Sequence, residues 1–204
     1  MLEAALSVVA RRGLSAITVN DIADEAGCSY GLIAFHFKTK ERLIFAVLDL
    51  LASNYEKIWL GAAASASASP AEKLRHLVEA DFDARVAKTK HLAVWMAFWE
   101  EAPHVPAYKK RCSELKHRSL DRMMTLVSEL AAERKVAVDA KAIARGLYAI
   151  NEGCWVFSHV TGENSPEMPK RSRQLCLTYL AAFFPSDFGE THKAVPDLAR
   201  RAGA

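Results

Sequence analysis

The apolar residues of this chain recur with the period of an α-helix, and this pattern limits the possible folds more than any other feature. Leu2, Ala5, Leu6 and Val9, for example, fall at positions i, i+3, i+4 and i+7, which places them on one face of a helix. No run alternates with the period of two that is typical of a half-buried strand. Glycine and proline are scarce, with 9 and 7 residues. The sequence therefore predicts an all-α fold and excludes collagen-like, disordered and all-β chains.

Capping signals divide the N-terminal part into short helices. Gly13 and Gly27 each follow an apolar stripe and act as helix stops. The hydroxyl of Thr18 can cap a following helix, with Asp21 where the helix dipole favours an acid, and Ser29 is a second N-cap. Helices are therefore expected over about residues 2–12, 19–26, 30–37 and 40–59.

The segment from residue 61 to 69 contains only glycine, alanine and serine, which is typical of a connection. After it, Ser69 is an N-cap, Pro70 suits the first helical position, and Glu72 completes a capping box. The later helices are expected over about residues 70–87, 90–102, 106–134, 139–161 and 168–183. We predict an N-terminal domain of residues 1–45 and a helical domain of residues 46–204.

The two short helices within residues 18–37 are joined by Gly27-Cys28-Ser29, and this arrangement is typical of a helix-turn-helix. On spacing alone, an ordinary corner between two helices is the alternative. The chain has a net charge of +3 from 27 basic and 24 acidic residues, and residues 1–47 are neutral overall. Charge therefore does not decide between the two interpretations.

The longer sequence of this region is more specific. It reads Thr18-Val-Asn-Asp-Ile-Ala-Asp-Glu-Ala-Gly27-Cys-Ser-Tyr-Gly-Leu-Ile-Ala-Phe-His-Phe37-Lys-Thr-Lys-Glu-Arg-Leu43. This pattern resembles the DNA-binding signature of the TetR family of bacterial transcriptional regulators. The resemblance outweighs the corner interpretation, and it implies a repressor that an effector releases from operator DNA.

Three segments of the C-terminal part carry a second resemblance. They are Trp95-Met-Ala-Phe-Trp99, then His104-Val-Pro106 with Tyr108, and Gly146-Leu-Tyr-Ala-Ile-Asn-Glu-Gly153-Cys-Trp155. They resemble the ligand domain of the BetI branch, whose members repress genes that convert choline to glycine betaine. The resemblance implies choline or a related quaternary ammonium compound as effector, although regulators with other inducers share this domain type.

The TetR resemblance also implies DNA-binding residues. A helix N-terminus such as that at Thr18 can hold a phosphate, and Gly31 lets the backbone approach the groove closely. Capping alone is the alternative for Thr18 and Ser29, and packing alone is the alternative for Phe35. The implied DNA-binding residues are Thr18, Asn20, Ser29, Tyr30, Gly31, Phe35, His36 and Lys40.

Ala34 departs from the family pattern, which commonly has tyrosine at this position. One phosphate contact is therefore expected to be absent, although the BetI branch also tends to a small residue here. Binding to the DNA backbone then depends more on His36 and Lys40.

The expected effector site consists of aromatic residues and one acid. Trp95 and Trp99 share a helix face at i, i+4, and Glu152 and Trp155 share another at i, i+3. If the two faces meet, they form an aromatic box closed by a carboxylate, which suits a quaternary ammonium ion. The expected effector-binding residues are Trp95, Phe98, Trp99, Tyr108, Glu152 and Trp155.

A dry core is the alternative for this set, because helical proteins bury aromatic residues in any case. Glu152 would then pair with a basic side chain such as Arg145 or Arg122.

A homodimer on palindromic operator DNA is the expected assembly. Helices 139–161 and 168–183 are the most apolar of the late segments and are expected to pair across a two-fold axis. Part of each helix must also serve the monomer core, so the contact residues stay open. The apolar candidates are Ile143, Leu147, Ile150, Cys154, Leu175, Leu180 and Phe183.

A metal-binding oxidoreductase is the alternative function. Glu101-x-x-His104 and Glu114-x-x-His117 have the spacing found in di-iron helical bundles. Pro103 interrupts the first motif, however, and little chain separates it from the second. We therefore expect these side chains to be solvated, with no cofactor, metal or catalytic residue. No phosphate loop or nucleophile elbow is present.

The chain is expected to be cytoplasmic and to have no membrane partner. Its longest strongly apolar stretch, residues 92–99, is too short to cross a bilayer. The cysteines show neither disulfide nor metal-site spacing, which favours a reducing compartment. They are Cys28, Cys112, Cys154 and Cys176.

Overall fold

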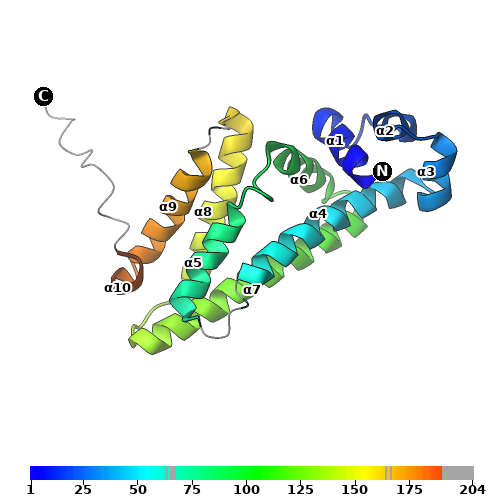
Figure 1. The fold of residues 1–204 in the computed structure, drawn as a ribbon. Coiled ribbons are helices and arrows are strands. Elements are labelled where there is room, and N and C mark those ends of the chain that lie inside the picture. The colour runs from blue at the N-terminus through cyan, green and yellow to red at the C-terminus, as the bar shows by residue number, and fades with distance from the viewer. Residues whose placement is uncertain (63, 65–67, 164, 166, 190–204) are drawn as a thin grey trace, which may run out of the picture.

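A computed structural model describes residues 1–62, 64, 68–163, 165 and 167–189 (Figure 1). All regular structure in these residues is helical, which confirms the all-α prediction. Residues 63 and 65–67 of the expected connection lie outside them. The helices are α1 Leu2–Arg12, α2 Val19–Ala26, α3 Tyr30–Phe37, α4 Lys40–Ala62, α5 Pro70–Asp81, α6 Thr89–Glu101, α7 Pro106–Arg134, α8 Ala140–Thr161, α9 Met168–Ala181 and α10 Pro185–Phe188.

The expected caps shape the head, which we define as α1–α3 with the start of α4. The amide of Asp21 donates to the hydroxyl of Thr18, and the Thr18 amide donates to the Asp21 carboxylate at 2.8 Å, so the pair forms a capping box. Gly27 ends α2 with a left-handed φ of 61°, which glycine adopts without strain. The Ser29 hydroxyl accepts from the Leu32 amide and begins α3. These local interactions confirm the predicted helix-turn-helix.

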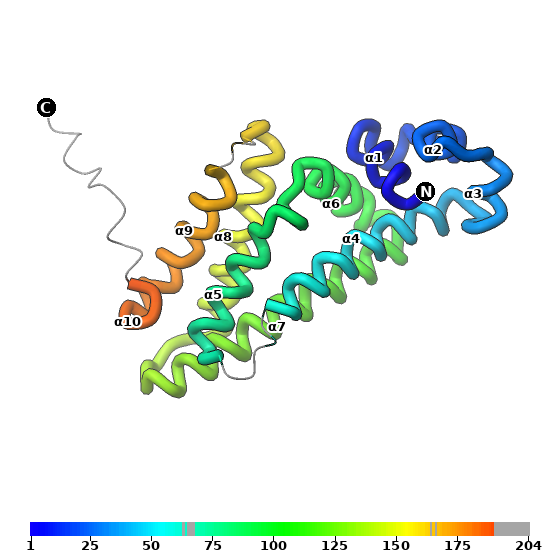
Figure 2. Tube along the Cα trace, in the orientation of Figure 1, coloured from blue at the N-terminus to red at the C-terminus, as the bar shows by residue number. Residues whose placement is uncertain are grey.

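Helix α4 connects the head to the rest of the molecule without a break (Figure 2). It begins beside α3 and runs along α7, which it contacts. Val47, Leu48 and Leu51 belong to the same buried cluster as the head helices. The predicted domain boundary at residue 45 therefore lies inside a continuous helix.

The head core includes residues of α6 as well as its own. Val94 of α6 is fully buried in the cluster that contains Leu6 of α1 and Ile44 of α4. Helix α6 lies between the head and the remaining helices, and α1 contacts it (Figure 1). A movement of α6 therefore reaches the head directly.

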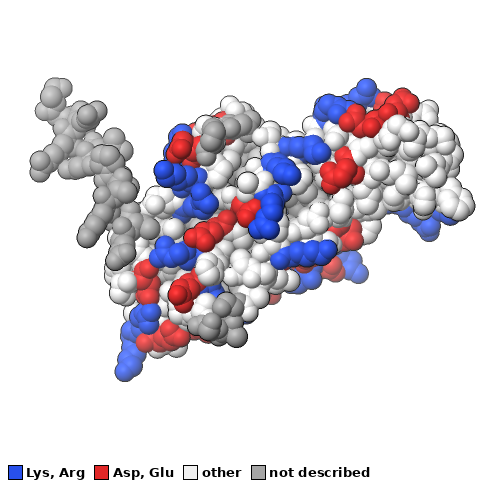
Figure 3. Space-filling view, viewed as in Figure 1, with Lys and Arg blue, Asp and Glu red and all other residues white. Residues whose placement is uncertain are grey.

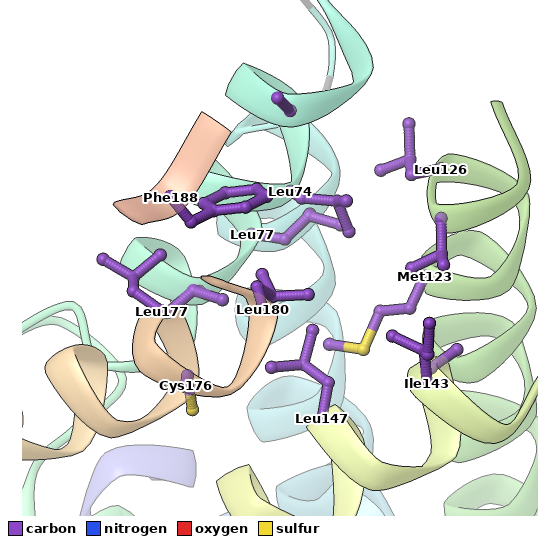
Figure 4. Close-up of a cluster of buried hydrophobic side chains, with 14 of the residues drawn as sticks. Leu74, Leu77, Met123, Leu126, Ile143, Leu147, Cys176, Leu177, Leu180 and Phe188 are labelled. Atoms are coloured by element: carbon purple, nitrogen blue, oxygen red, sulfur yellow. The ribbon is translucent and has the colours of Figure 1, made fainter. Parts of the chain in front are cut away.

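A second core fills the bundle formed by α5, α7, α8, α9 and α10 (Figure 4). Leu77 of α5, Leu126 of α7, Leu147 of α8 and Leu180 of α9 are all at most 1% exposed. Phe188 of the short helix α10 closes one side of this core. The bundle thus packs separately from the head core.

Some helix ends differ from the prediction. Helix α5 ends at Asp81 rather than near residue 87. The Asp83 carboxylate accepts a hydrogen bond from the backbone amide of Arg85, and this interaction turns the chain. Helix α9 ends at Ala181, and the unpredicted helix α10 follows it. Arg134 binds the Asp187 carboxylate of α10 through Nε at 2.9 Å.

No helix of the described residues is long and apolar enough to span a bilayer. The four cysteines are all unpaired.

Candidate DNA interface and effector cavity

Helix α3 presents an exposed apolar surface at the end of the molecule. Tyr30 is 57% exposed and Phe35 70% exposed, with Leu32 beside them also exposed. Phe35 therefore does not pack in the core, and its ring instead lies 4.9 Å from the Lys38 ammonium. On the face seen in Figure 3, this end of the molecule carries little charge apart from its edges.

The other expected DNA-binding residues surround this surface. Asn20, Gly31 and His36 are exposed, and Lys40 is half-buried at the start of α4. Nothing lies closer than 3.9 Å to the position that a Cβ of Gly31 would take. Thr18 and Ser29 both act as caps and are exposed as well. The structure brings the expected residues to one region, and their contact with DNA stays a prediction.

Ion pairs within the head neutralise the arginines of α1. Arg11 binds Glu25 at 2.6 Å, and Arg12 binds Asp21 at 2.5 Å. No ion pair of the described residues engages Lys38, Lys40 or Arg42, at the junction of α3 and α4. The cations available to DNA therefore lie next to the exposed surface of α3.

A cavity of about 60 Å³ lies between α6, α7 and α8 and reaches α4 and α5. A water molecule needs roughly 10–15 Å³ on the same measure, so the space suits a ligand of few non-hydrogen atoms. Its aromatic and charged wall includes Trp95, Trp99, Lys116, Tyr148, Glu152 and Trp155.

The two helix faces expected to form an aromatic box both line this cavity. The Trp95 and Trp99 rings lie 6.1 Å apart on α6, and Glu152 and Trp155 come from α8. The ring of Trp155 stacks on Phe82 at 5.1 Å, which fixes its orientation. The structure therefore joins four of the six expected effector-binding residues in one site.

Phe98 and Tyr108 are not among the residues that line the cavity, and their expected role as effector contacts stays a prediction. Both belong to the head core, where their rings meet edge to face at 5.1 Å. Phe98 lies on the side of α6 that packs against the head. Helix period alone did not show which side of α6 faces the cavity.

Glu152 pairs with a lysine, and neither Arg145 nor Arg122 is its partner. The Lys116 ammonium donates to Glu152 Oε2 at 2.5 Å. The same ammonium lies 3.9 Å from the centre of the Trp99 ring and 5.7 Å from that of Tyr148. Burial and the charge of Glu152 raise the pKa of Tyr148. An internal ion pair therefore occupies the cavity wall.

Asp81 supplies a second carboxyl group to the same cavity. It is 2% exposed and accepts hydrogen bonds from the Tyr55 hydroxyl and, at 2.6 Å, from Asn151 Nδ2. Burial, together with the charge of Glu152, raises the pKa of Asp81 to about 7. At neutral pH this carboxyl group is therefore only partly ionised.

The sequence contained signals for these unpredicted residues. Leu74, Leu77, Val78 and Asp81 fall at i, i+3, i+4 and i+7 on the buried stripe of α5. Tyr55 and Lys116 also continue inward-facing stripes, on α4 and α7 respectively. A polar residue on an apolar stripe needs a buried partner, and this requirement marks all three positions.

The two Glu-x-x-His motifs do not converge. Glu101 ends α6 and accepts a hydrogen bond from Ser15, whereas Glu114 and His117 are exposed on α7. Within the described residues, no group of three or more His, Cys, Asp or Glu side chains could hold a metal ion.

An exposed apolar strip runs along α8. Phe157 is 61% exposed and Val160 77% exposed, with Val156 beside them and Leu175 exposed on α9. Several expected dimer contacts belong instead to the monomer core, because Ile143, Leu147 and Leu180 are buried there. These three side chains serve the monomer core in this structure and are not free for contact with a second copy.

Both parts of the chain match known families. Residues 1–47 match the model described as bacterial regulatory proteins, tetR family, and residues 70–185 match the BetI-type transcriptional repressor C-terminal model. The regulator BetI of Paraburkholderia phymatum is 29% identical over 88% of this chain and 89% of its own length. BetI of Serratia proteamaculans is 31% identical over 79% of this chain and 80% of its own length.

Solved structures share the fold. A transcriptional regulator from Pseudomonas aeruginosa PAO1 has a TM-score of 0.76 and 24% identity, covering 94% of this chain and 90% of that one. A regulator from Saccharomonospora viridis in complex with choline has a TM-score of 0.72 and 23% identity, covering 88% and 92%. The chain belongs to the TetR family of bacterial regulators, with a BetI-type C-terminal domain, and is a ligand-responsive DNA-binding transcriptional repressor.

Proposed function

We propose that the effector is a small quaternary ammonium cation of the choline type, bound in the cavity between α6, α7 and α8. The observation that carries this proposal is the meeting of Trp95, Trp99 and Trp155 with the carboxylate of Glu152 around one cavity. A quaternary ammonium ion has no N–H to donate, so aromatic faces and a nearby anion recognise it. The choline bound to the similar S. viridis regulator supports the same class of ligand.

Calorimetric titration tests this proposal. Choline and betaine aldehyde should bind, whereas the neutral analogue of choline, with carbon in place of nitrogen, should not. Trp99→Ala should weaken binding of the cations, because each ring contact contributes about 0.5–2 kcal/mol. Glu152→Gln should weaken it as well, because the substitution removes the anion that attracts the cation. Equal binding of the neutral analogue, or no binding of any cation, would contradict the proposal.

We propose that α3 enters the major groove, with Ser29, Tyr30 and Gly31 at its N-terminus nearest the bases. The exposure of Tyr30 and Phe35 supports this orientation. Thr18, His36 and Lys40 contact phosphates, and Asn20 and Phe35 complete the interface. As a dimer, the protein should prefer a palindrome whose half-site centres lie about one helical turn, or a multiple of it, apart.

We further propose that two copies pair through α8 and α9. The supporting observation is the exposed strip of Val156, Phe157, Val160 and Leu175, because large exposed apolar patches mark interaction sites. Phe157→Glu should then give a monomer in sedimentation at micromolar concentration. Leu60→Glu, an exposed leucine of α4 away from this strip, is the control and should stay dimeric. An unchanged Phe157→Glu dimer would refute this interface.

Effector binding acts on the head through shared helices. Trp95 and Trp99 lie on α6, whose other side packs in the head core, and Tyr55 links α4 to Asp81. An effector that binds better to one arrangement of α4 and α6 shifts the population toward it. In this proposal, the favoured arrangement no longer fits the operator.

A further inference from the structure

The cation site proposed above is already filled by a cation of the protein itself. Lys116 on α7 holds its ammonium against the Trp99 face at 3.9 Å and against Glu152 Oε2 at 2.5 Å. These are the two features that a quaternary ammonium ligand requires, an aromatic face and an anion. A ligand cation and the Lys116 ammonium therefore cannot use the same face and carboxylate together.

We propose that Lys116 is a tethered competitor of the effector: its ammonium holds the cation site while the protein is free of effector, and a quaternary ammonium ion binds by displacing it. This inference rests on the proposed function, because it concerns the same cavity and the same class of ligand.

The properties of the two cations favour this exchange. The lysine ammonium is compact and strongly hydrated, and it is carried on a flexible stem. The side chain of Lys116 is 33% exposed, so a rotation of the stem returns the ammonium to water. A quaternary ammonium ion cannot form hydrogen bonds with water through N–H groups and gains more from the aromatic walls. Glu152 keeps a cationic partner before and after the exchange.

The internal cation also serves the effector-free protein. Without Lys116, the Glu152 carboxylate would stand beside Trp99 and Trp155 with no opposite charge, and an unpaired charge among apolar groups is costly. With Lys116 in place, the apparent effector affinity equals the intrinsic affinity multiplied by the fraction of molecules in which the site is open. Lys116 therefore sets the effector concentration at which the repressor responds.

Competition also determines selectivity. A primary ammonium ligand makes the same contacts with Trp99 and Glu152 that the Lys116 ammonium already makes. It also loses translational and rotational entropy on binding, which the tethered lysine does not. A ligand that covers more of the Trp99 and Trp95 faces gains contacts that the lysine lacks. The site therefore favours trialkylated ammonium groups over simple amines.

Titration of substituted proteins with choline tests the proposal. Lys116→Met keeps the length of the side chain and removes its charge, and should bind choline about ten-fold more tightly or better, which corresponds to about 1.4 kcal/mol. Lys116→Arg keeps an internal cation that stacks well on tryptophan and should bind choline no better than the natural protein. Lys110→Met, an exposed lysine of the same helix, is the charge-matched control and should leave the affinity unchanged.

A second measurement uses the unsubstituted protein and separates displacement from a simple change of charge. Choline at saturation should increase the acetylation of Lys116 by an amine-specific reagent, measured by mass spectrometry, because the displaced ammonium leaves Glu152. Acetylation of Lys110 should not change. This measurement also decides the matter if Lys116→Met fails to fold.

The outcomes distinguish the two proposals. Weaker or equal choline binding by Lys116→Met, or unchanged acetylation of Lys116, would overturn the competitor role while leaving the effector class intact. Binding of no cation by either the natural protein or Lys116→Met would overturn the effector class, and the competitor role with it.

Discussion

Phe98 and Trp99 are neighbours on α6, yet they belong to different sites of the molecule. The Phe98 ring is fully buried in the head core against Tyr108, whereas the Trp99 ring lines the cavity between α6, α7 and α8, beside the Lys116 ammonium. One turn of helix therefore carries both the head contact and the proposed ligand contact.

Truncating these two rings should separate stability from binding. Phe98→Ala should lower the free energy of unfolding by about 3–5 kcal/mol, because it opens a cavity in a closed core. Trp99→Ala should cost less stability, since its ring is only half-buried, while it removes an effector contact. Denaturant unfolding and calorimetry with choline measure both effects. Equal losses of stability in the two variants would contradict the assignment.

Tyr30→Ala and Lys40→Ala should affect DNA binding in different ways. If Tyr30 contacts bases, its removal alters the sequence preference. If Lys40 contacts a phosphate, its removal weakens binding to all sequences similarly and reduces the slope of log affinity against log salt by about one. Fluorescence anisotropy over a salt series measures both. Operator binding that is unchanged in both variants would exclude this interface.

Effector affinity should increase with pH between about 6 and 8. The pKa of Asp81 is raised to about 7, so more of its carboxylate is ionised as the pH rises, and the added negative charge attracts a cation. Choline keeps its charge over this range and contributes no titration. The charged and titratable groups that line the same cavity are Glu152, Lys116, Tyr55 and Tyr148. Calorimetry of the natural protein and Asp81→Asn should show the dependence only in the former.

The same carboxyl group should affect stability with the opposite sign. Its folded pKa lies above the value of about 3.9 in an unfolded chain, so the folded state binds the proton more tightly. This contribution is complete below about pH 4 and is lost as the pH rises through about 7. The stability of the natural protein relative to Asp81→Asn should therefore fall across this range. A constant difference would show that Asp81 titrates normally.

Gly146→Ala should destabilise the protein although alanine is the better helix former. A Cβ at this position would lie 2.1 Å from the Tyr179 hydroxyl and 2.7 Å from Cζ of the same ring. The Tyr179 ring, which packs against Phe183, would have to shift or the helices α8 and α9 would have to move apart, at a cost of about 1–3 kcal/mol. Gly153→Ala on the same helix meets nothing within 4 Å and should stabilise by up to about 1 kcal/mol. Chemical unfolding at one protein concentration compares them.

Local rules predicted the parts of the fold that depend on local interactions. The capping boxes of Thr18 with Asp21 and of Ser69 with Glu72 are both present, because each requires only residues three positions apart. The end of α5 was not predictable in this way. Apolar residues continue the helical period to residue 87, but the turn at Asp83 depends on a side-chain hydrogen bond that competes with the helix.

The cavity was predictable only in its aromatic walls. Spacing placed Trp95 with Trp99 and Glu152 with Trp155, since each pair shares a helix face. The partner of Glu152 depends on how α7 packs against α8, and several basic residues were compatible with the sequence. Packing selects Lys116, and no spacing within one helix contains this information.

The internal ion pairs of α1 bear on how the repressor searches the chromosome. Arg11 and Arg12 are paired with acids of the head, so we expect random DNA to attract the head mainly through the cations near α3 and α4. Each phosphate contact contributes about 0.9 to the slope of log affinity against log salt. With few such contacts, complexes with non-operator DNA are weak and dissociate quickly. We expect this repressor to travel mainly through solution, so that operator occupancy follows changes in its free concentration without a large reservoir on the genome.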